Sequence, residues 1–367
     1  MRANSEAASK WLEDPEELTK SDSRGQLRIL DRFDSQLENA LAIGEDLEDL
    51  DLGGPFQNIL CCGLGGSAIG GDFLASYLGE ELAVPFQVHR GYGVPGCVDP
   101  RTLVLVCSYS GNTEETLSAF RAARSAGAQT VCVSSNGELG RLAGELRCPW
   151  VRIPPGLPPR SALGYLTVPV LLLLHRLGLV PDRSPEVRRS IAGVRRTIAA
   201  YRADHPIDRN PAKQLALQIH GCVTVVYGSR GRLDSVARRW AGQFCENAKQ
   251  LTHFATLPES DHNQIAGWKH PDAALKRMAA VFLRDRGDHS RLQIRHQVTR
   301  RLISRLGTRT LEVWSEGEGW LERLWSLILL GDYGSIYLAL LNREDPTPIK
   351  VIEDLKEHLA GISHEGL

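Results

Sequence analysis

The chain has 367 residues, 42% of them hydrophobic and 24% charged, which is typical of a globular protein with room for two domains. Its 43 Lys and Arg residues nearly balance 44 Asp and Glu, and the net charge of -1 excludes a global basic field for nucleic acid. Because residues 1–24 are polar and the longest apolar run, 168–174, is too short to cross a bilayer, we expect no signal peptide and no membrane partner.

The eight cysteines show no spacing typical of a metal site. Several lie within or beside apolar runs typical of strands, where a small buried thiol is common: Cys61, Cys62, Cys107 and Cys132. Such thiols fit a reducing compartment, so we expect a cytoplasmic protein with no metal and no other cofactor.

Residues 1–50 contain no functional motif and are assigned to an N-terminal helical extension, and residues 51–180 then alternate between strand and helix patterns. Strands are predicted at 58–62, 84–89, 102–107, 130–134 and 150–153, and helices at 68–78, 114–126 and 138–145. Because strands joined by crossover helices pair in parallel, this first domain should be an α/β unit, a parallel sheet flanked by helices.

A proline-rich loop at 154–160 and a helix ending near 178 close the first unit, and two prolines within 178–185 mark the domain junction. Residues 186–367 repeat the alternation. Strands are predicted at 223–227, 252–257, 279–284 and 308–313, and helices at 186–203, 210–219, 233–250, 288–305, 317–342 and 348–360. Two units of similar length and pattern predict a duplicated αβα fold.

A glycine-rich stretch, Gly63 to Gly71, follows the first predicted strand and opens the next helix. It resembles a dinucleotide-binding turn, but that motif requires an acidic residue at the end of the second strand, where this chain has His89-Arg90. A tight turn that needs a positive φ would explain one or two of the five glycines. Neither interpretation accounts for the whole stretch.

A second loop, Ser108 to Thr116 (SYSGNTEET), lies between a strand and a helix. The N–H groups and the dipole of a helix N-terminus favour an anion, and the hydroxyls of Ser108, Ser110 and Thr113 add donors without adding charge. The alternative is an ordinary helix cap made by Ser110 or Asn112. A cap needs only one such residue, so this loop and the glycine-rich stretch together favour a phosphate cradle.

Three motifs in this half, GGSAIGGD (65–72), SYSGNTEET (108–116) and PRSALGY (159–165), resemble those of the sugar isomerase (SIS) domain family. They are most similar to those of its bifunctional phosphoglucose/phosphomannose isomerases. The resemblance continues through Glu246-Asn247-Ala248-Lys249, Asp261-His262-Asn263, and Asp345-Pro346-Thr347-Pro348 with Leu355-Lys356, and so covers roughly residues 55–360.

The resemblance implies two SIS-type αβα domains, at 51–180 and 186–367, in a homodimer whose active site is completed across the interface. It implies a metal-independent aldose-ketose isomerase that interconverts glucose 6-phosphate or mannose 6-phosphate with fructose 6-phosphate through a cis-enediol. Two alternatives remain open: an isomerase with a narrower or different sugar-phosphate range, and a non-catalytic regulator that only binds a sugar phosphate.

The resemblance also assigns roles to individual residues. The substrate phosphate would be held by Gly66, Ser67, Ser108, Ser110 and Thr113. Arg160 would lie near C1 and C2 of the sugar, and Glu246 would be the base. His262 and Lys356 would open the sugar ring, with Lys350 as the alternative lysine.

These residue types suit the chemistry. One carboxylate within reach of both carbons can move a proton between C2 and C1, a guanidinium can stabilise the enediolate, and a histidine can transfer the ring-opening proton. Taken singly, each residue would more commonly be an ordinary surface residue. Lys249, three positions after Glu246, could simply be its ion-pair partner.

Overall fold

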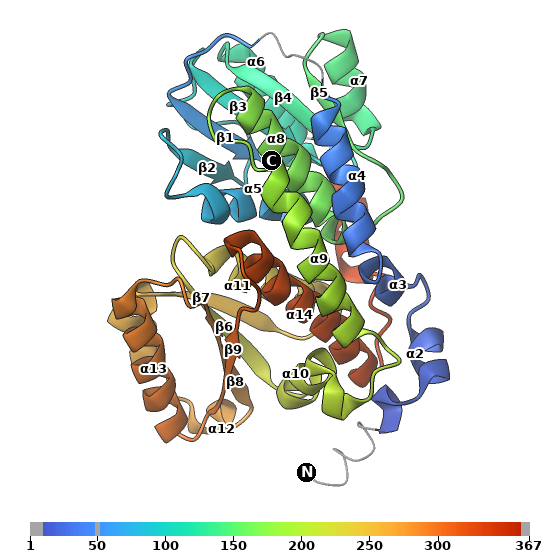
Figure 1. Cartoon of the computed structure of the whole chain (residues 1–367), viewed down its shortest axis with the longest axis vertical. Helices are drawn as coiled ribbons and strands as arrows, with labels where there is room; N and C mark the ends of the chain where they lie inside the picture. The colour runs from blue at the N-terminus through green and yellow to red at the C-terminus, as the bar shows by residue number, and fades with distance from the viewer. Residues whose placement is uncertain (1–9, 48–51, 361–367) are drawn as a thin grey trace.

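A computed structural model of the chain describes residues 10–47 and 52–360. It contains two parallel sheets, one of five strands and one of four, each flanked by helices. In Figure 1 the first sheet lies above the second, and long helices run along one side of both. The predicted α/β class with two parallel sheets is therefore confirmed.

The first sheet has the strand order β2-β1-β3-β4-β5. Its strands are β1 (Asn58–Cys62), β2 (Phe86–His89), β3 (Thr102–Cys107), β4 (Gln129–Ser134) and β5 (Trp150–Arg152). Alternate residues of β3 face opposite layers, as the two-residue period of a strand requires. Leu103 and Leu105 join the core formed with α5 (Gly65–Leu78) and α8 (Leu163–Arg176), whereas Val104 and Val106 join that formed with α6 (Glu114–Ser125) and α7 (Gly137–Glu145).

The second sheet has the order β7-β6-β8-β9, which repeats the order of the first four strands of the first sheet. Its strands are β6 (Val223–Ser229), β7 (Thr252–Leu257), β8 (Met278–Arg284) and β9 (Arg309–Trp314). Helices α10 (Pro211–Ile219), α11 (Asp234–Glu246) and α14 (Trp320–Leu341) share one core with this sheet. Helices α12 (Asp272–Leu275) and α13 (Ser290–Arg305) contribute to the core on its other face.

The remaining helices border these two units. They are α2 (Pro15–Ser21), α3 (Gln26–Leu30), α4 (Phe33–Glu45), α9 (Ser184–Tyr201) and α15 (Lys350–Ala360), with short 3-10 turns η1 (Pro159–Ser161), η2 (Ile207–Arg209), η3 (Glu259–His262) and η4 (Gln264–Gly267). Helix α4 packs along α8, and α9 packs along both α4 and α14. The parts of the predicted N- and C-terminal segments at 1–9, 48–51 and 361–367 lie outside the described residues.

Among the described helices, only α14 has the length and the apolar composition needed to span a membrane. Its apolar stretch is completely buried within the protein, against α9, α10 and α11. An apolar helix covered on all sides is expected at the centre of a large domain, so its hydropathy is explained by its position in the core.

Gly331 of α14 allows the closest contact between α14 and α11. The indole of Trp240 on α11 is fully buried there and donates its N–H to the carbonyl of Leu327, 2.8 Å away. A Cβ atom added at Gly331 would lie 2.2 Å from Trp240 Nε1. Since α11 also carries residues of the candidate site, this contact supports the site as well as the core.

We therefore expect Gly331→Ala to lower the free energy of unfolding by about 1–3 kcal/mol, because the indole must move in a close-packed interior. Gly144→Ala is the matched control, because Gly144 is an exposed helical glycine whose added Cβ would meet nothing within 4 Å. The control should gain about 0.4–1 kcal/mol from reduced freedom of the unfolded chain. Denaturant unfolding measures the free energy of unfolding of each variant. Equal stability of Gly331→Ala and Gly144→Ala would contradict the proposed contact.

Candidate active site

The two loops expected to form a phosphate cradle lie together at the carboxyl edge of the first sheet. Helix α5 begins at Gly65, three residues earlier than predicted, so Ser67 lies in its first turn. Ser67 Oγ accepts a hydrogen bond from Tyr109 N at 3.0 Å, and Ser108 Oγ donates to Thr113 Oγ1 at 3.1 Å. Neither α5 nor α6 has a side-chain cap hydrogen bond, and a helix N-terminus without a capping side chain favours an anion.

The alternative that Ser110 or Asn112 caps helix α6 is not observed. Ser110 Oγ accepts from Asn112 N at 3.3 Å, and Asn112 Oδ1 accepts from Glu138 N at 2.9 Å. Gly111 between them has φ +73°, and a Cβ there would lie 1.8 Å from Asn136 O. The loop is therefore shaped by its own backbone contacts, which leave Ser110 exposed at its tip.

Arg160 is buried, and its guanidinium is held from two directions. Its Nε donates to Asn247 Oδ1 at 2.6 Å, and its Nη2 donates to the carbonyls of Pro346 and Thr347 at 2.8 and 2.9 Å. The remaining nitrogen, Nη1, lies 3.9 Å from Glu246 Oε2. Arg160 thus presents one edge of a fixed, permanently charged group to the carboxylate.

Glu246 is the last residue of α11, which ends four residues earlier than predicted. The possible partner Lys249 has φ +51° and donates instead to the carbonyls of Asn247 and Asp345, at 3.1 and 2.6 Å. Burial raises the pKa of Glu246 above its ordinary value, while nearby cations, Arg160 first among them, act in the opposite direction. A carboxyl group whose pKa is raised toward neutrality is suited to take up and return a proton.

Glu246 and Arg160 open into a pocket of about 200 Å³ between the two domains. The first domain contributes the glycine-rich turn, and the second contributes successive residues of α11. The lining comprises Gly65, Gly66, Ile69, Arg90, Arg160, Arg238, Arg239, Gly242, Gln243 and Glu246. Four arginines and one acid make this pocket suited to a small anion with a proton to exchange.

Several residues of this site were not identified from the sequence. Arg239 forms an ion pair with buried Asp332 of α14, with Nη2 2.7 Å from Oδ2, and also donates to Arg160 O at 2.9 Å. Gln243 donates to the same Asp332 at 2.9 Å, and Asn247 donates to Ser335 Oγ at 2.9 Å. The available signal was the i, i+4 spacing of Arg239, Gln243 and Asn247, which places three polar residues on one face of a helix.

His262 does not reach this pocket within the same chain. Glu246 ends α11, which begins after the carboxyl end of β6, whereas His262 follows the carboxyl end of the neighbouring strand β7. Because α11 runs back over the sheet for 13 residues, these positions lie at opposite edges of the second sheet, about 20 Å apart. The His262 side chain is exposed.

Lys356 lies on α15, where every residue from 350 to 359 is exposed. Its charge is near enough to act on Glu246, because Lys356 is among the cations that lower the pKa of that carboxyl group. This electrostatic contact favours Lys356 over Lys350 as the lysine of the site.

Comparisons with known proteins match both domains to known families. Residues 57–143 match the family model of the SIS domain, and residues 208–359 match that of the bacterial phospho-glucose isomerase C-terminal SIS domain. A bifunctional phosphoglucose/phosphomannose isomerase of Caldicellulosiruptor bescii is 38% identical over 333 residues, covering 89% of this chain and 96% of the relative. One from Aquifex aeolicus is 35% identical, covering 83% and 91%.

Among solved structures, a glucose-6-phosphate isomerase like protein from Thermus thermophilus has a similar fold. The TM-score is 0.60 at 19% sequence identity, over 93% of this chain and 99% of that chain. At this identity the likeness concerns the fold alone.

The proximity of Arg160 to Glu246 generates a prediction about protonation. Replacing the guanidinium by a neutral amide in Arg160→Gln removes the cation that most strongly stabilises the carboxylate, so we expect the pKa of Glu246 to rise further. Carbon-13 NMR of labelled glutamate carboxyls across pH measures this directly. Arg152→Gln, which removes an arginine stacked on Trp150, is the control and should leave the pKa of Glu246 unchanged. If the pKa of Glu246 were also unchanged in Arg160→Gln, the two groups would not interact.

Proposed function

Because the chain belongs to the family of bifunctional phosphoglucose/phosphomannose isomerases, we propose that it interconverts glucose 6-phosphate or mannose 6-phosphate with fructose 6-phosphate. The observation that carries the proposal is the pairing of Glu246 with Arg160 in a pocket bordered by an uncapped, glycine-rich helix N-terminus. This pocket offers a candidate base and a fixed cation, and the proposed phosphate cradle borders it through Gly65 and Gly66.

In the proposed reaction, Ser67, Ser108, Ser110 and Thr113 bind the substrate phosphate together with the backbone at Gly66. The carboxylate of Glu246 takes the proton from C2 of the open-chain aldose. The C2–H electrons form the C1–C2 double bond, and the carbonyl oxygen on C1 gains the negative charge of an enediolate. Arg160 stabilises that charge. A proton then moves from the hydroxyl on C2 to the oxygen on C1. Glu246 returns its proton to C1: the electrons of the C1–C2 double bond form the new C1–H bond, while the oxygen on C2 forms the carbonyl of fructose 6-phosphate.

Glucose and mannose 6-phosphates differ only in the configuration at C2, and both give the same cis-enediol once the C2 proton has left. The pocket must therefore accept two directions of the C2–H bond. Because the breaking C2–H bond stands perpendicular to the plane of the enediol, one carboxylate on one face of that plane can serve both epimers if the sugar turns about its C2–C3 bond. The route requires no metal or cofactor.

Ring opening needs a proton donor and acceptor near O1 and O5, and His262 is our candidate. Because His262 lies at the opposite edge of its own sheet from Glu246, we propose that the partner subunit's His262 completes each site. Asp261 supports the orientation of this segment, because its carboxylate is bound by Arg295 at 2.9 Å and Thr299 at 2.6 Å, both on α13.

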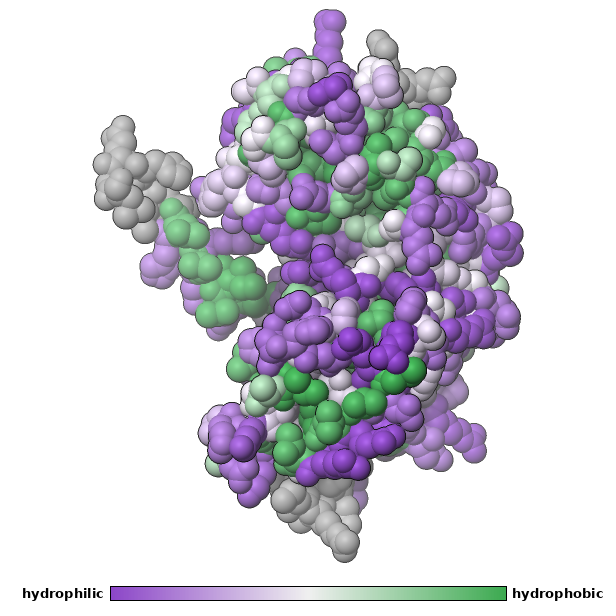
Figure 2. Space-filling model, turned by 90° about the vertical axis from the view of Figure 1, so that its left-hand side faces the viewer, coloured by the Kyte–Doolittle hydropathy of each residue, from purple (hydrophilic) through white to green (hydrophobic). Residues whose placement is uncertain are grey.

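Two unpartnered apolar surfaces support this homodimer. Helix α13 exposes Ile294, Val298 and Leu302 at four-residue spacing, on the same helix that binds Asp261. Helix α15, which carries Lys356, exposes apolar residues along its length: Val351, Ile352, Leu355 and Leu359. Figure 2, which looks onto the α13 side of the molecule, shows hydrophobic atoms in its lower half and a second hydrophobic strip that projects from the body. Burial of both surfaces against a second copy would bring the His262 segment toward a neighbouring site.

The proposed cellular location is the cytoplasm. All eight cysteines are free thiols, and six of them are buried. Free thiols are retained in a reducing compartment, where a sugar-phosphate substrate is also found.

Replacement of the base separates an isomerase from a binding protein. Glu246→Gln keeps the size of the side chain but removes the base, so turnover and C2-proton exchange with deuterated solvent should fall by at least about 100- to 10,000-fold. Affinity for glucose 6-phosphate, measured by calorimetry, should remain close to that of the parent, because the phosphate contacts lie in the first domain. Glu138→Gln, a change at a solvent-facing ion pair, is the control. Exchange at the parental rate in Glu246→Gln would refute the assignment, and a parent inactive on every hexose phosphate would favour a regulator.

Complementation tests the shared site. Glu246→Gln and His262→Ala are each expected to be inactive, but a dimer containing one of each has one site with both functional residues. Random pairing of coexpressed chains makes half of the dimers mixed, so about a quarter of the parental activity should return. The purified mixed dimer, isolated through two different affinity tags, gives the measurement. Recovery of no activity would place His262 and Glu246 of one chain in the same site.

A further inference from the structure

The second domain repeats the strand order of the first, so its carboxyl edge contains a position equivalent to the proposed phosphate cradle. Ser108 is the first residue after β3, and Asp285 is the first residue after the corresponding strand, β8. Likewise, Ser135 follows β4 and Ser315 follows β9. An aspartate in the second domain therefore stands where the first domain has a hydroxyl that faces the anion site. This place lies outside the catalytic pocket.

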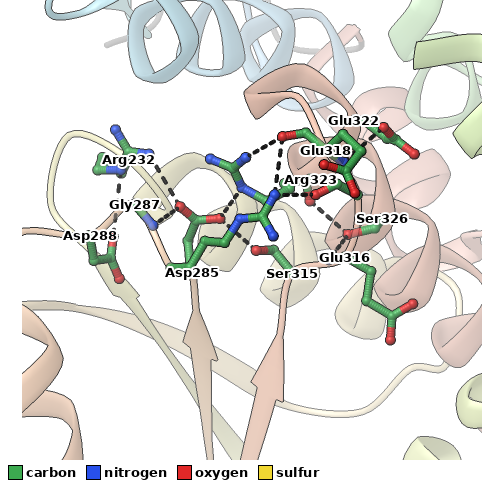
Figure 3. Close-up of polar contacts among 12 residues, drawn as sticks. Arg232, Asp285, Gly287, Asp288, Ser315, Glu316, Glu318, Glu322, Arg323 and Ser326 are labelled. Carbon is green, nitrogen blue, oxygen red and sulfur yellow. Dashed lines mark hydrogen bonds and ion pairs between the residues drawn. The ribbon is translucent and has the colours of Figure 1, made fainter. Parts of the chain in front are cut away.

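The carboxylate of Asp285 is fully buried and accepts four hydrogen bonds. Its donors are Arg323 Nε at 2.7 Å, Ser315 Oγ at 2.5 Å, Gly287 N at 2.7 Å and Arg232 Nη2 at 3.2 Å. Figure 3 shows these groups converging on Asp285 above the ends of two neighbouring strands. Two guanidinium groups, a hydroxyl and a backbone N–H are the donor types that proteins use for phosphate oxygens.

The backbone around the carboxylate is shaped for a close approach. A Cβ atom added at Gly287 would lie 2.7 Å from Arg232 Nη2 and 2.8 Å from Asp285 Oδ1. These atoms belong to side chains, so a Cβ at Gly287 would press on the charged groups themselves. In the glycine-rich turn of the first domain the close neighbour is backbone, because a Cβ at Gly66 would lie 2.7 Å from Pro159 O.

Arg232 and Arg323 are also held by contacts with residues other than Asp285. The guanidinium groups of Arg232 and Arg323 lie 4.1 and 5.4 Å from the ring centre of Trp320. Arg323 Nη1 donates to Glu318 O at 2.9 Å, and Arg232 Nε lies 3.6 Å from Asp288 Oδ1. The donors would thus keep their positions if the carboxylate of Asp285 were removed.

The charges around the carboxylate are closely balanced. The buried acids Asp285 and Asp288 face the two arginines, and Glu80, which lies 3.7 Å from Arg232, is highly exposed and screened by solvent. Removing Asp285 leaves two guanidinium groups against one buried acid. An uncompensated buried cation is costly, so the vacated space would favour an anion from solution.

We propose that Asp285 is an internal ligand: its carboxylate occupies the oxyanion site of the second domain, and this domain takes up no phosphate while Asp285 is in place. Removal of the carboxylate exposes a site for inorganic phosphate or a phosphomonoester. The duplicated fold thus retains two cradles of related geometry but leaves one open to a ligand, so each chain binds a single sugar phosphate.

Asp285→Ser, which introduces the residue found after β3, is the test, and inorganic phosphate is the probe. Calorimetry at constant ionic strength should show at most one equivalent of phosphate bound by the parent and a second equivalent bound by the variant. The melting temperature of the variant should also rise with phosphate concentration more steeply than that of the parent, because a ligand that binds only the folded state stabilises it. Chloride at the same ionic strength should give no such rise.

Two further variants control for the loss of a buried acid. Asp261→Ser also removes a carboxylate bound by an arginine and a hydroxyl, outside any cradle, and should gain no phosphate site. Adding Arg323→Met to Asp285→Ser should abolish the second equivalent. A folded Asp285→Ser protein with unchanged phosphate stoichiometry would overturn the proposal.

If Asp285→Ser does not fold in chloride, its recovery by refolding in phosphate is the expected result, and failure in both buffers counts against the proposal. Phosphate stoichiometry is independent of isomerase activity. Failure of the proposed function would therefore leave this result interpretable.

Discussion

The candidate site depends on a buried ion pair between Arg239 and Asp332. Asp332 lies in the middle of the buried core helix α14, and its charge is stabilised there by Arg239 and Gln243 of α11, which donate to it. The pair therefore fixes how α11 lies against α14. Arg239 uses a further hydrogen bond to hold the backbone of Arg160, which belongs to the first domain. A single carboxylate thus sets the position of the helix that carries Glu246 and that of the arginine opposite it.

This arrangement positions Glu246, the proposed base, at the end of a helix. Helix α11 stops at Glu246, and the next residue, Asn247, bonds both to Arg160 and to Ser335 of α14. The chain then turns through the positive φ of Lys249 to enter β7. Asn247 still has helical backbone angles, φ -80° and ψ -52°, so its amide projects from the end of α11 toward both neighbours. The short helix is therefore part of the geometry of the pocket.

Much of the fold could be predicted from the sequence, because the strands are continuous apolar runs and the helices between them are of ordinary length. The errors concern helix ends. Gly65 and Gly66 read as a turn but form the first turn of α5, because the packing of that helix outweighs the low helix propensity of glycine. Helix α11 was predicted to continue to residue 250, but Lys249 has a left-handed backbone conformation. That conformation depends on a contact with the distant carbonyl of Asp345, which the local sequence does not reveal.

The site was predictable in part and for different reasons. Hydroxyl-rich and glycine-rich loops have a local signature, so Ser67 and Ser108 could be selected from the sequence. Arg239 and Asp332 are 93 positions apart, and nothing in either local pattern indicates that they meet. Motifs also carry no information on which chain supplies a residue. The motif around His262 suggests a candidate for ring opening, whereas only the direction of α11 relative to β7 places His262 at the edge of the sheet opposite Glu246.

The hold on Arg160 by Pro346 and Thr347 has a consequence for how the protein is made. The cradle, the base and the arginine are all synthesised well before these two carbonyls, which lie near the end of the chain. A chain truncated before Pro346 would keep Glu246, the proposed cradle and the Asn247 acceptor of Arg160 Nε, but it would lose both acceptors of Arg160 Nη2 and also Lys356. Part of the restraint on the guanidinium group is therefore added only when the last segment of the chain has been synthesised.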